Sequence, residues 1–317
     1  MNKKIGILTL GFLLIVSLTF AFVGCGPEAE DEFVTIGAGS PGGVYYPLGA
    51  GIDYVLERRD EDINASSETT GASVENVRYV ADGTHTMGMA MSNIAYDGYM
   101  GEGDFEDDGE LPIRTLFSMY DAQQHLIVPE GSDIETVYDL EGKSVSVDAM
   151  GSGCQVTSYI ILEYAGILDD VDTEYYSQPE ARDALIDGDV DAVFYNFASE
   201  AGVIEEIKAS RDIRFIPMDE DLIDEIVEDY PYFVGGVIPE GHYGLEEDVT
   251  SLNVGNLMLV HEDMDEDFAY KLLEDIFHED SIDELEGIHP MASHFEVVDG
   301  IEPPLHPGAE RFLEDNQ

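Results

Sequence analysis

The chain has 317 residues, 44% of them hydrophobic, and its 69 Asp and Glu against 13 Lys and Arg give a formal net charge of −56 at pH 7. That length can bury a sizeable core, most naturally as two domains, and glycine-punctuated apolar segments recur along the whole chain, which excludes a disordered protein. The charge excludes nucleic acid as a partner and favours a protein that folds in concentrated salt, where the Debye length falls to about 3 Å at 1 M.

Residues 1–24 have the layout of an export signal, with two lysines followed by an apolar run from Ile5 to Val23. The next residues resemble the lipobox of bacterial lipoproteins, in which the cysteine, here Cys25, is acylated and begins the mature chain. Phe22 stands where that motif usually has Leu. An uncleaved membrane anchor is the alternative, because the run is almost long enough to span a bilayer. We expect an exported protein, lipid-anchored to the outer face of the cytoplasmic membrane, with residues 25–32 as a linker.

A short β-prone run, Phe33–Ile36, leads into the glycine-rich stretch 37–43 and then a helix from Tyr45 to Leu56. Such a turn points backbone N–H groups and a helix N-terminus at one spot, which suits an anionic or strongly polar ligand.

The same stretch contains G-x-G-x-x-G, the fingerprint of a dinucleotide-binding Rossmann site. That fingerprint requires an acidic residue about twenty positions further on, where this chain has Arg58 and Arg59. NAD is also not expected outside the membrane. A polar small-molecule site is therefore the better interpretation.

Two more strand-loop-helix units follow. Ile63–Ser66 is a predicted strand, after which Ser73 can cap a helix. Thr86–Met91 is a third strand, which ends at Ser92 and Asn93, and its methionines are interpreted as core. Three successive units imply a parallel sheet, which binds ligands in the loops at the carboxyl ends of its strands.

A similar pattern begins again after Pro129. A strand ending at Val147 leads into the glycine loop 151–155 and a helix that ends near Gly166. A later strand, ending at Tyr195 and Asn196, delivers two hydrogen-bonding side chains to a loop. Two glycine loops facing one another would form a cleft between two lobes. With Cys25 used for lipid, Cys154 has no partner for an intramolecular disulfide.

Metal and catalytic signals are weak. The acidic loop 101–110 mimics the first half of an EF-hand but has Thr115 where a bidentate Glu is needed. Three histidines near the C-terminus lack a zinc-binding spacing. No G-x-S-x-G or Ser-x-x-Lys is present, and no cofactor is expected. The segment Pro231–Gly244 is rich in turn residues, and the apolar run Val254–Val260 is placed to return the chain to the first lobe.

Several blocks in family order together resemble the TAXI-type solute receptors of TRAP transporters. They are GAGSPGGVYYPLGAG, GASVENVRYV, LEGKSVSVDAMGSG, LIDGDVDAVFYNF, PYFVGGVIPEGHYG and PLHPGAERF, and the first begins at Gly37 and the last ends at Phe312. Cys154 departs from the family pattern, which has Thr or another small polar residue there.

The resemblance implies a type II periplasmic-binding-protein-like fold with two α/β lobes and a ligand cleft between them. It implies lobe 1 at residues 33–122 plus 258–317 and lobe 2 at 123–257, with crossover strands near Met119–Val128 and Val254–Val260. It also implies capture of a small carboxylate-bearing solute, such as a glutamate-like amino acid or a dicarboxylate, for delivery to TRAP membrane permease subunits.

The expected ligand-binding residues lie at strand ends and helix starts: Ser40, Gly42, Gly43, Tyr45, Ser73, Asn76, Ser92, Asn93, Gly151, Ser152, Gly153, Gln155, Tyr195 and Asn196. Arg78 or Arg114 is a candidate basic anchor, although either could pair with a surface acid, so a cationic or neutral ligand stays open. A secreted hydrolase using Ser40 or Ser152 and a structural surface lipoprotein are the alternatives.

Overall fold

The computed structural model describes residues 32–41, 43–198, 201–230 and 232–316. Residues 1–24 and Cys25, which carry the export-signal and lipid-anchor predictions, lie outside these ranges, as does Gly42. Within the described ranges, no helix combines the length and the apolar character needed to cross a membrane.

The described strands form one mixed sheet. They are β1 (Glu32–Gly37), β2 (Ile63–Glu68), β3 (Met87–Met91), β4 (Ile113–Pro129), β5 (Ser144–Ser146), β6 (Asp172–Glu174), β7 (Ala192–Phe197), β8 (Ile213–Phe215), β9 (Phe233–Ile238) and β10 (Val249–His261). The α-helices are α2 (Tyr45–Arg59), α3 (Ser73–Ala81), α4 (Ser92–Met100), α5 (Gly153–Tyr164), α6 (Gln178–Asp187), α7 (Gly202–Ser210), α8 (Glu220–Asp229), α9 (Glu266–Ile276), α10 (Glu279–Ile288) and α11 (Pro307–Asp315).

Two long antiparallel strands, β4 and β10, connect the two ends of the sheet. The strand order is β2-β1-β3-β10-β4-β7-β5-β6, with β8 paired to β4 and β9 paired to β10. The first half of β10 pairs with β9 and its second half pairs with β3. The second half of β4 pairs with β7. Each long strand therefore pairs with strands of two separate groups.

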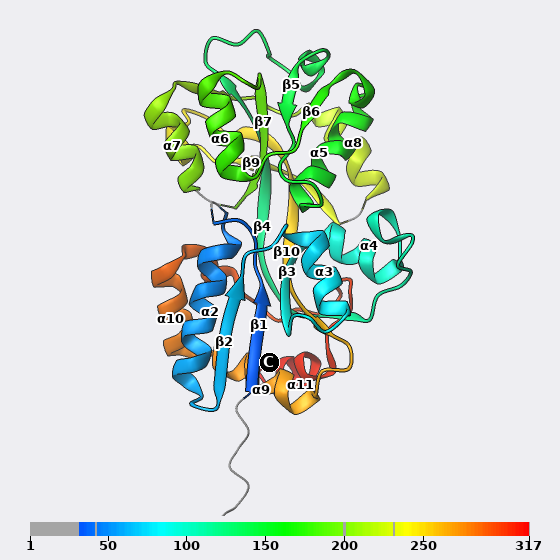
Figure 1. Ribbon diagram of the computed structural model, residues 1–317, viewed down its shortest axis with the longest axis vertical. Coiled ribbons are helices and arrows are strands. Elements are labelled where there is room, and N and C mark those ends of the chain that lie inside the picture. The colour runs from blue at the N-terminus through cyan, green and yellow to red at the C-terminus, as the bar shows by residue number, and fades with distance from the viewer. Residues whose placement is uncertain (1–31, 42, 199–200, 231, 317) are drawn as a thin grey trace, which may run out of the picture. The chain divides into compact units, whose positions relative to one another are not determined.

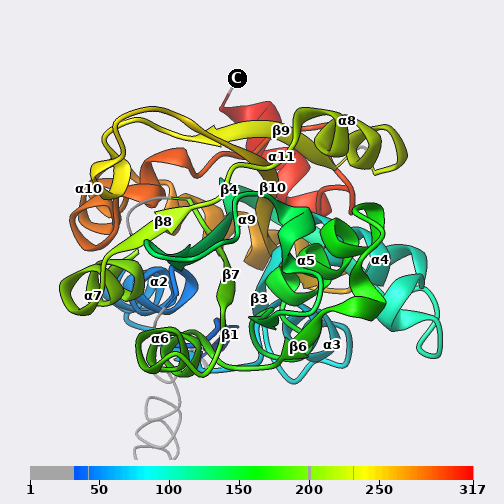
Figure 2. The same cartoon turned by 90° about the horizontal axis from the view of Figure 1, so that it is seen from above.

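The two groups of strands define two α/β lobes (Figure 1). Lobe 1 holds β1–β3 with α2–α4 and α9–α11, and lobe 2 holds β5–β9 with α5–α8. Seen from above, β4 and β10 run next to each other among the helices of both lobes (Figure 2). The predicted lobe boundaries fall inside β4 and β10 and stay a proposal.

Strand β3 illustrates how the sheet is buried. All five of its residues are buried, because helices cover both faces of the sheet here, and its methionines belong to the core as predicted. Beside it, α2 presents Leu48, Ile52 and Leu56 to the same core while its polar residues face outward.

Two local predictions were wrong. Ser73 does not cap α3: Ala72 occupies the N-cap, and the Ser73 hydroxyl instead accepts a hydrogen bond from Met91 N at 3.1 Å. The turn-rich segment after Pro231 contains strand β9, in which Gly236 lets the Asn253 side chain approach, since a Cβ there would lie 2.2 Å from Asn253 Nδ2. Glycine in this strand thus reflects close packing rather than a turn.

The C-terminal histidines act within the fold. The Nδ1 atoms of His289 and His306 accept backbone N–H bonds from Met291 and Gly308 and cap the helices that follow them. No group of three or more His, Cys, Asp or Glu side chains in the described part of the chain is arranged to hold a metal ion.

Candidate ligand-binding site

A cavity of about 60 Å³ lies where the two lobes meet. Its wall draws on both lobes and on both crossing strands. The lining residues are Gly39, Ser40, Gly43, Val44, Tyr45, Ala72, Ser73 and Met91 from lobe 1, Asp148, Ser152, Gly153, Cys154, Gln178, Asn196 and Phe197 from lobe 2, and Tyr120 and Asn256 from β4 and β10. Seven predicted site residues are therefore brought together here: Ser40, Gly43, Tyr45, Ser73, Ser152, Gly153 and Asn196.

The first glycine loop reaches lobe 2 through Gln178. The Ser40 hydroxyl donates to Gln178 Oε1 at 3.2 Å, and a Cβ on Gly43 would lie 2.8 Å from the same oxygen. Tyr45 donates its hydroxyl hydrogen to Asn256 Oδ1. Burial raises the pKa of Tyr45, so its phenol stays protonated and serves as a neutral donor.

The second glycine loop touches lobe 1 directly. The carbonyl of Gly151 accepts the Val74 N–H at 3.2 Å. Ser152 is the N-cap of α5, its hydroxyl accepting the Gln155 N–H at 3.1 Å. The N-terminus of α5, with its unpaired N–H groups, thus lies at the cavity wall and favours a negative or polar ligand group.

Five other predicted residues with described positions do not line the cavity: Asn76, Ser92, Asn93, Gln155 and Tyr195. Gly151 does not line it either, although Ser152 and Gly153, which follow it, do. Tyr195 is fully buried and donates to the carbonyl of Gln178 at 3.0 Å, which positions that residue. Gln155 Oε1 accepts the Gly151 N–H at 3.1 Å and so shapes the loop from behind.

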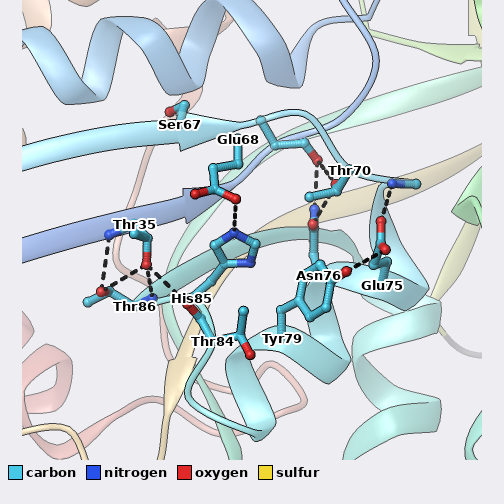
Figure 3. Close-up of polar contacts among 12 residues, drawn as sticks. Thr35, Ser67, Glu68, Thr70, Glu75, Asn76, Tyr79, Thr84, His85 and Thr86 are labelled. Atoms are coloured by element: carbon cyan, nitrogen blue, oxygen red, sulfur yellow. Dashed lines mark hydrogen bonds and ion pairs between the residues drawn. The ribbon is translucent and has the colours of Figure 1, made fainter.

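Asn76 supports the start of the first loop from within the core, and its bond with Thr70 is drawn in Figure 3. Its Nδ2 donates to the carbonyls of Ala38 and Met89, both at 2.7 Å, and its Oδ1 accepts the hydroxyl hydrogen of Thr70 at 2.7 Å. The side chain is fully buried. It therefore ties the end of β1 to β3 and positions the loop instead of contacting a ligand.

Four polar residues of the cavity wall were not predicted from the sequence: Asp148, Gln178, Asn256 and Tyr120. Asp148 follows β5 in the loop before α5, and only 5% of its surface is exposed. Its Oδ1 accepts the Ala149 N–H at 2.7 Å. Burial raises the pKa of Asp148 to about 7, and hydrogen bonds from Ala149, Gln178, Cys154 and Ser152 oppose that rise. A polar residue directly after a strand was the signal that could have identified it.

Cys154 lies in the cavity wall and is a free, buried thiol. Gln124 Nε2 approaches its Sγ at 3.4 Å and also donates to Ser158 Oγ at 2.9 Å. Burial raises the pKa of the Cys154 thiol well above its usual range, so the sulfur stays protonated and is a poor nucleophile.

The candidate basic anchors are on the surface. Arg78 donates to Asp108 Oδ2 at 2.9 Å, and Arg114 pairs with Glu262 at 2.7 Å. Among the described residues that line the cavity, none is Lys, Arg or His. Among the described residues of this wall, an acid, Asp148, is the ionisable group whose pKa lies near neutrality.

A model of the NMT1-like family matches residues 36–316. Among solved structures, a Xanthomonas citri protein bound to ATP matches with a TM-score of 0.53 and 13% identity over 89% of this chain and 94% of that one. Its chloride-bound form matches with a TM-score of 0.52 and 14% identity over 89% of this chain and 95% of that one. The periplasmic aliphatic sulphonate binding protein SsuA of Escherichia coli matches with a TM-score of 0.45 and 16% identity over 90% of this chain and 88% of that one. At such identities the likeness to the Xanthomonas citri protein concerns the fold alone. The two lobes and the strand order, together with that likeness, agree with the predicted type II periplasmic-binding-protein-like fold.

Proposed function

The chain belongs to the NMT1-like family, and on that premise we propose that it is an extracytoplasmic solute receptor, which captures one small polar molecule and releases it to a membrane permease. The observation that carries the proposal is the cavity that both lobes and both crossing strands line. A ligand in this cavity touches both lobes at once, which is what a receptor that closes on its cargo requires.

The more specific part of the proposal is that the receptor is of the TAXI type and serves a TRAP permease. Its support is that the two glycine loops by which the chain resembles that family, around Ser40 and Ser152, both form the cavity wall. Attachment through a lipid on Cys25, at the outer face of the cytoplasmic membrane, belongs to the same proposal. A permease reading frame beside the gene would support it at no experimental cost.

The ligand we propose carries a carboxylate, as a glutamate-like amino acid or a dicarboxylate does. The loop N–H groups and the N-terminus of α5 are neutral donors that suit it. A cavity of about 60 Å³ with lobes in contact suits a solute of this size better than a peptide or an oligosaccharide.

The hydrolase alternative receives less support. Ser40 donates to Gln178, and Ser152 accepts from the Gln155 N–H. A nucleophilic serine needs a base within hydrogen-bond reach, and no histidine is among the described residues of the cavity wall.

The mechanism we propose is a population shift from an open to a closed form, in which the ligand contributes contacts to both lobes only when they meet. Gly153 is the residue through which this step can be tested. A Cβ at this position would lie 2.2 Å from Met91 Sδ and 2.9 Å from Ser73 Oγ, both in lobe 1.

We therefore expect Gly153→Val to weaken ligand binding by about tenfold or more, because the lobes can no longer meet as they do here, while the melting temperature changes little. Titration calorimetry measures the affinity. Gly287→Ala is the matched control, since a Cβ on this helical glycine meets nothing within 4 Å. Unchanged affinity in Gly153→Val would show that closure does not use this contact.

The function itself is tested by a thermal-shift screen in molar salt of the chain lacking residues 1–25, since the compact unit begins at Phe33. The panel holds amino acids, mono- and dicarboxylates, and sugars as controls. One compound should raise the melting temperature saturably, because native-state binding adds RT ln(1 + [L]/Kd) to stability. If no compound does so and mass spectrometry of the denatured protein finds no co-purified solute, the receptor proposal fails.

A further inference from the structure

Asp148 has a backbone conformation that an aspartate adopts only at a cost. Its φ is 78°, in the left-handed region that favours glycine. Placing a residue with a Cβ there costs about 1 kcal/mol or more, and such strain is concentrated at ligand sites. The chain thus holds a carboxyl group in the cavity wall at a position where glycine would be easier to accommodate.

Among the described residues, none gives this carboxyl group a positive partner. Its Oδ1 accepts the Ala149 N–H, and its other close neighbours, Ser152, Gln178 and Cys154, are uncharged. No Lys, Arg or His belongs to the described wall of the cavity. A buried carboxylate without a counter-charge is unfavourable, and a cation supplied by the ligand would remove that penalty.

We propose that Asp148 binds the ammonium group of the solute, so that the receptor selects an amino acid over the dicarboxylate of the same skeleton. This inference rests on the receptor function proposed above. Two parts of the cavity wall then bind the two ends of the ligand: Asp148 binds the ammonium group, and the neutral donors of the two glycine loops bind the carboxylate. Deep burial makes the pair specific, because the desolvated carboxylate gains most from a ligand that carries a positive charge.

The titratable groups next to Asp148 do not change their protonation state near neutral pH. Burial raises the pKa of the Cys154 thiol and of the phenols of Tyr45, Tyr120 and Tyr195, so all four stay protonated at pH 5 to 8. Further out, Arg182 and Asp183 pair with each other on α6. An ammonium ligand needs ionised Asp148, whereas a ligand carboxylate facing it needs the protonated form. The affinity for an amino acid therefore rises with pH across about 7, and the affinity for a dicarboxylate falls.

The test is titration calorimetry in molar salt at pH 5.5 and 8 with matched pairs that differ only in the amino group: L-glutamate and glutarate, L-alanine and propionate, L-leucine and 4-methylpentanoate. We expect one amino acid to bind at least about tenfold more tightly than its partner acid at pH 8. We expect Asp148→Asn to lower the affinity for that amino acid by about 30-fold or more and to leave the affinity for the acid unchanged. Asp148→Gly, which also relieves the backbone strain, should lose the same discrimination. Asp107→Asn, at an exposed position, is the matched control.

The outcomes separate the two proposals. An acid that binds as tightly as its amino acid, or more tightly, with an affinity that falls as pH rises, overturns the role of Asp148 and leaves the receptor standing. Amino-acid binding that Asp148→Asn leaves unchanged does the same. If neither member of any pair binds at either pH, and no amino acid is found by mass spectrometry in the denatured protein, both proposals fall.

Discussion

Dialysis from molar salt into low salt is expected to unfold this protein. The chain carries a formal net charge of −56 at pH 7, and at 0.1 M salt the Debye length grows from about 3 Å to about 10 Å, so many more carboxylates repel one another. Far-UV circular dichroism against salt concentration should show a cooperative loss of helix signal as salt is removed, reversed when it is restored.

Helix α8 shows how repulsion between carboxylates destabilises an element of the fold. Its sequence, EDLIDEIVED, buries Leu222, Ile223 and Ile226, and every charged residue on its outer face is acidic. Like charges three or four positions apart destabilise a helix by about 0.2–0.5 kcal/mol a pair, and α10 repeats the pattern. The few cations of the chain cannot neutralise such surfaces.

The control for the salt experiment separates charge screening from other effects of salt. Lowering the pH to about 4 in low salt protonates carboxylates and should restore part of the helix signal, whereas sucrose, which stabilises burial without screening, should restore less. A melting curve that does not change between 0.1 M and molar salt would contradict the proposal that the protein is adapted to salt.

The second large effect concerns the stability of the ligand-free protein. Asp148 has a pKa of about 7 in the folded protein against an ordinary value of 3.8. Between these values the folded state binds more protons than the unfolded state, so the free energy of unfolding falls as pH rises from about 4 to 7. Above pH 7 the ionised, buried carboxylate lowers the free energy of unfolding by on the order of 4 kcal/mol relative to a protein in which Asp148 stays protonated.

Asp148→Asn removes this titration while keeping the shape of the side chain. We expect the variant to be more stable than the wild type at pH 8, by up to about 4 kcal/mol, and to match it near pH 4. Urea titrations at the two pH values in molar salt measure the difference. Asp107→Asn should have the free energy of unfolding of the wild type at both pH values. An Asp148→Asn variant that is less stable than the wild type at pH 8 would show that the charge of the carboxylate is already compensated within the protein.

The loops of the site could be predicted from the sequence, because their signals are local. A β-prone run, clustered glycines and a following helix placed Ser40 and Ser152 at strand ends, and both lie in the cavity wall. The alternation of strands and helices likewise predicted the parallel parts of the sheet.

The rest of the wall depends on tertiary packing. Asn256 lies in the middle of β10, and nothing in an apolar run indicates that its side chain meets Tyr45 from the other end of the chain. Gln178 starts a helix like many other polar residues and reaches Ser40 only because the lobes meet. Asn76 is the converse case: a polar residue near a loop that supports the loop from within the core.

The path of the chain through β4 and β10 also bears on how the molecule is assembled. Lobe 2 is one continuous stretch, so its contacts can form from neighbouring segments. Lobe 1 needs α9–α11 to return to strands made at the start of the chain, and closing so long a loop carries the larger entropy cost. We therefore expect lobe 2 to fold before lobe 1, with the cavity completed only when the last helices have docked.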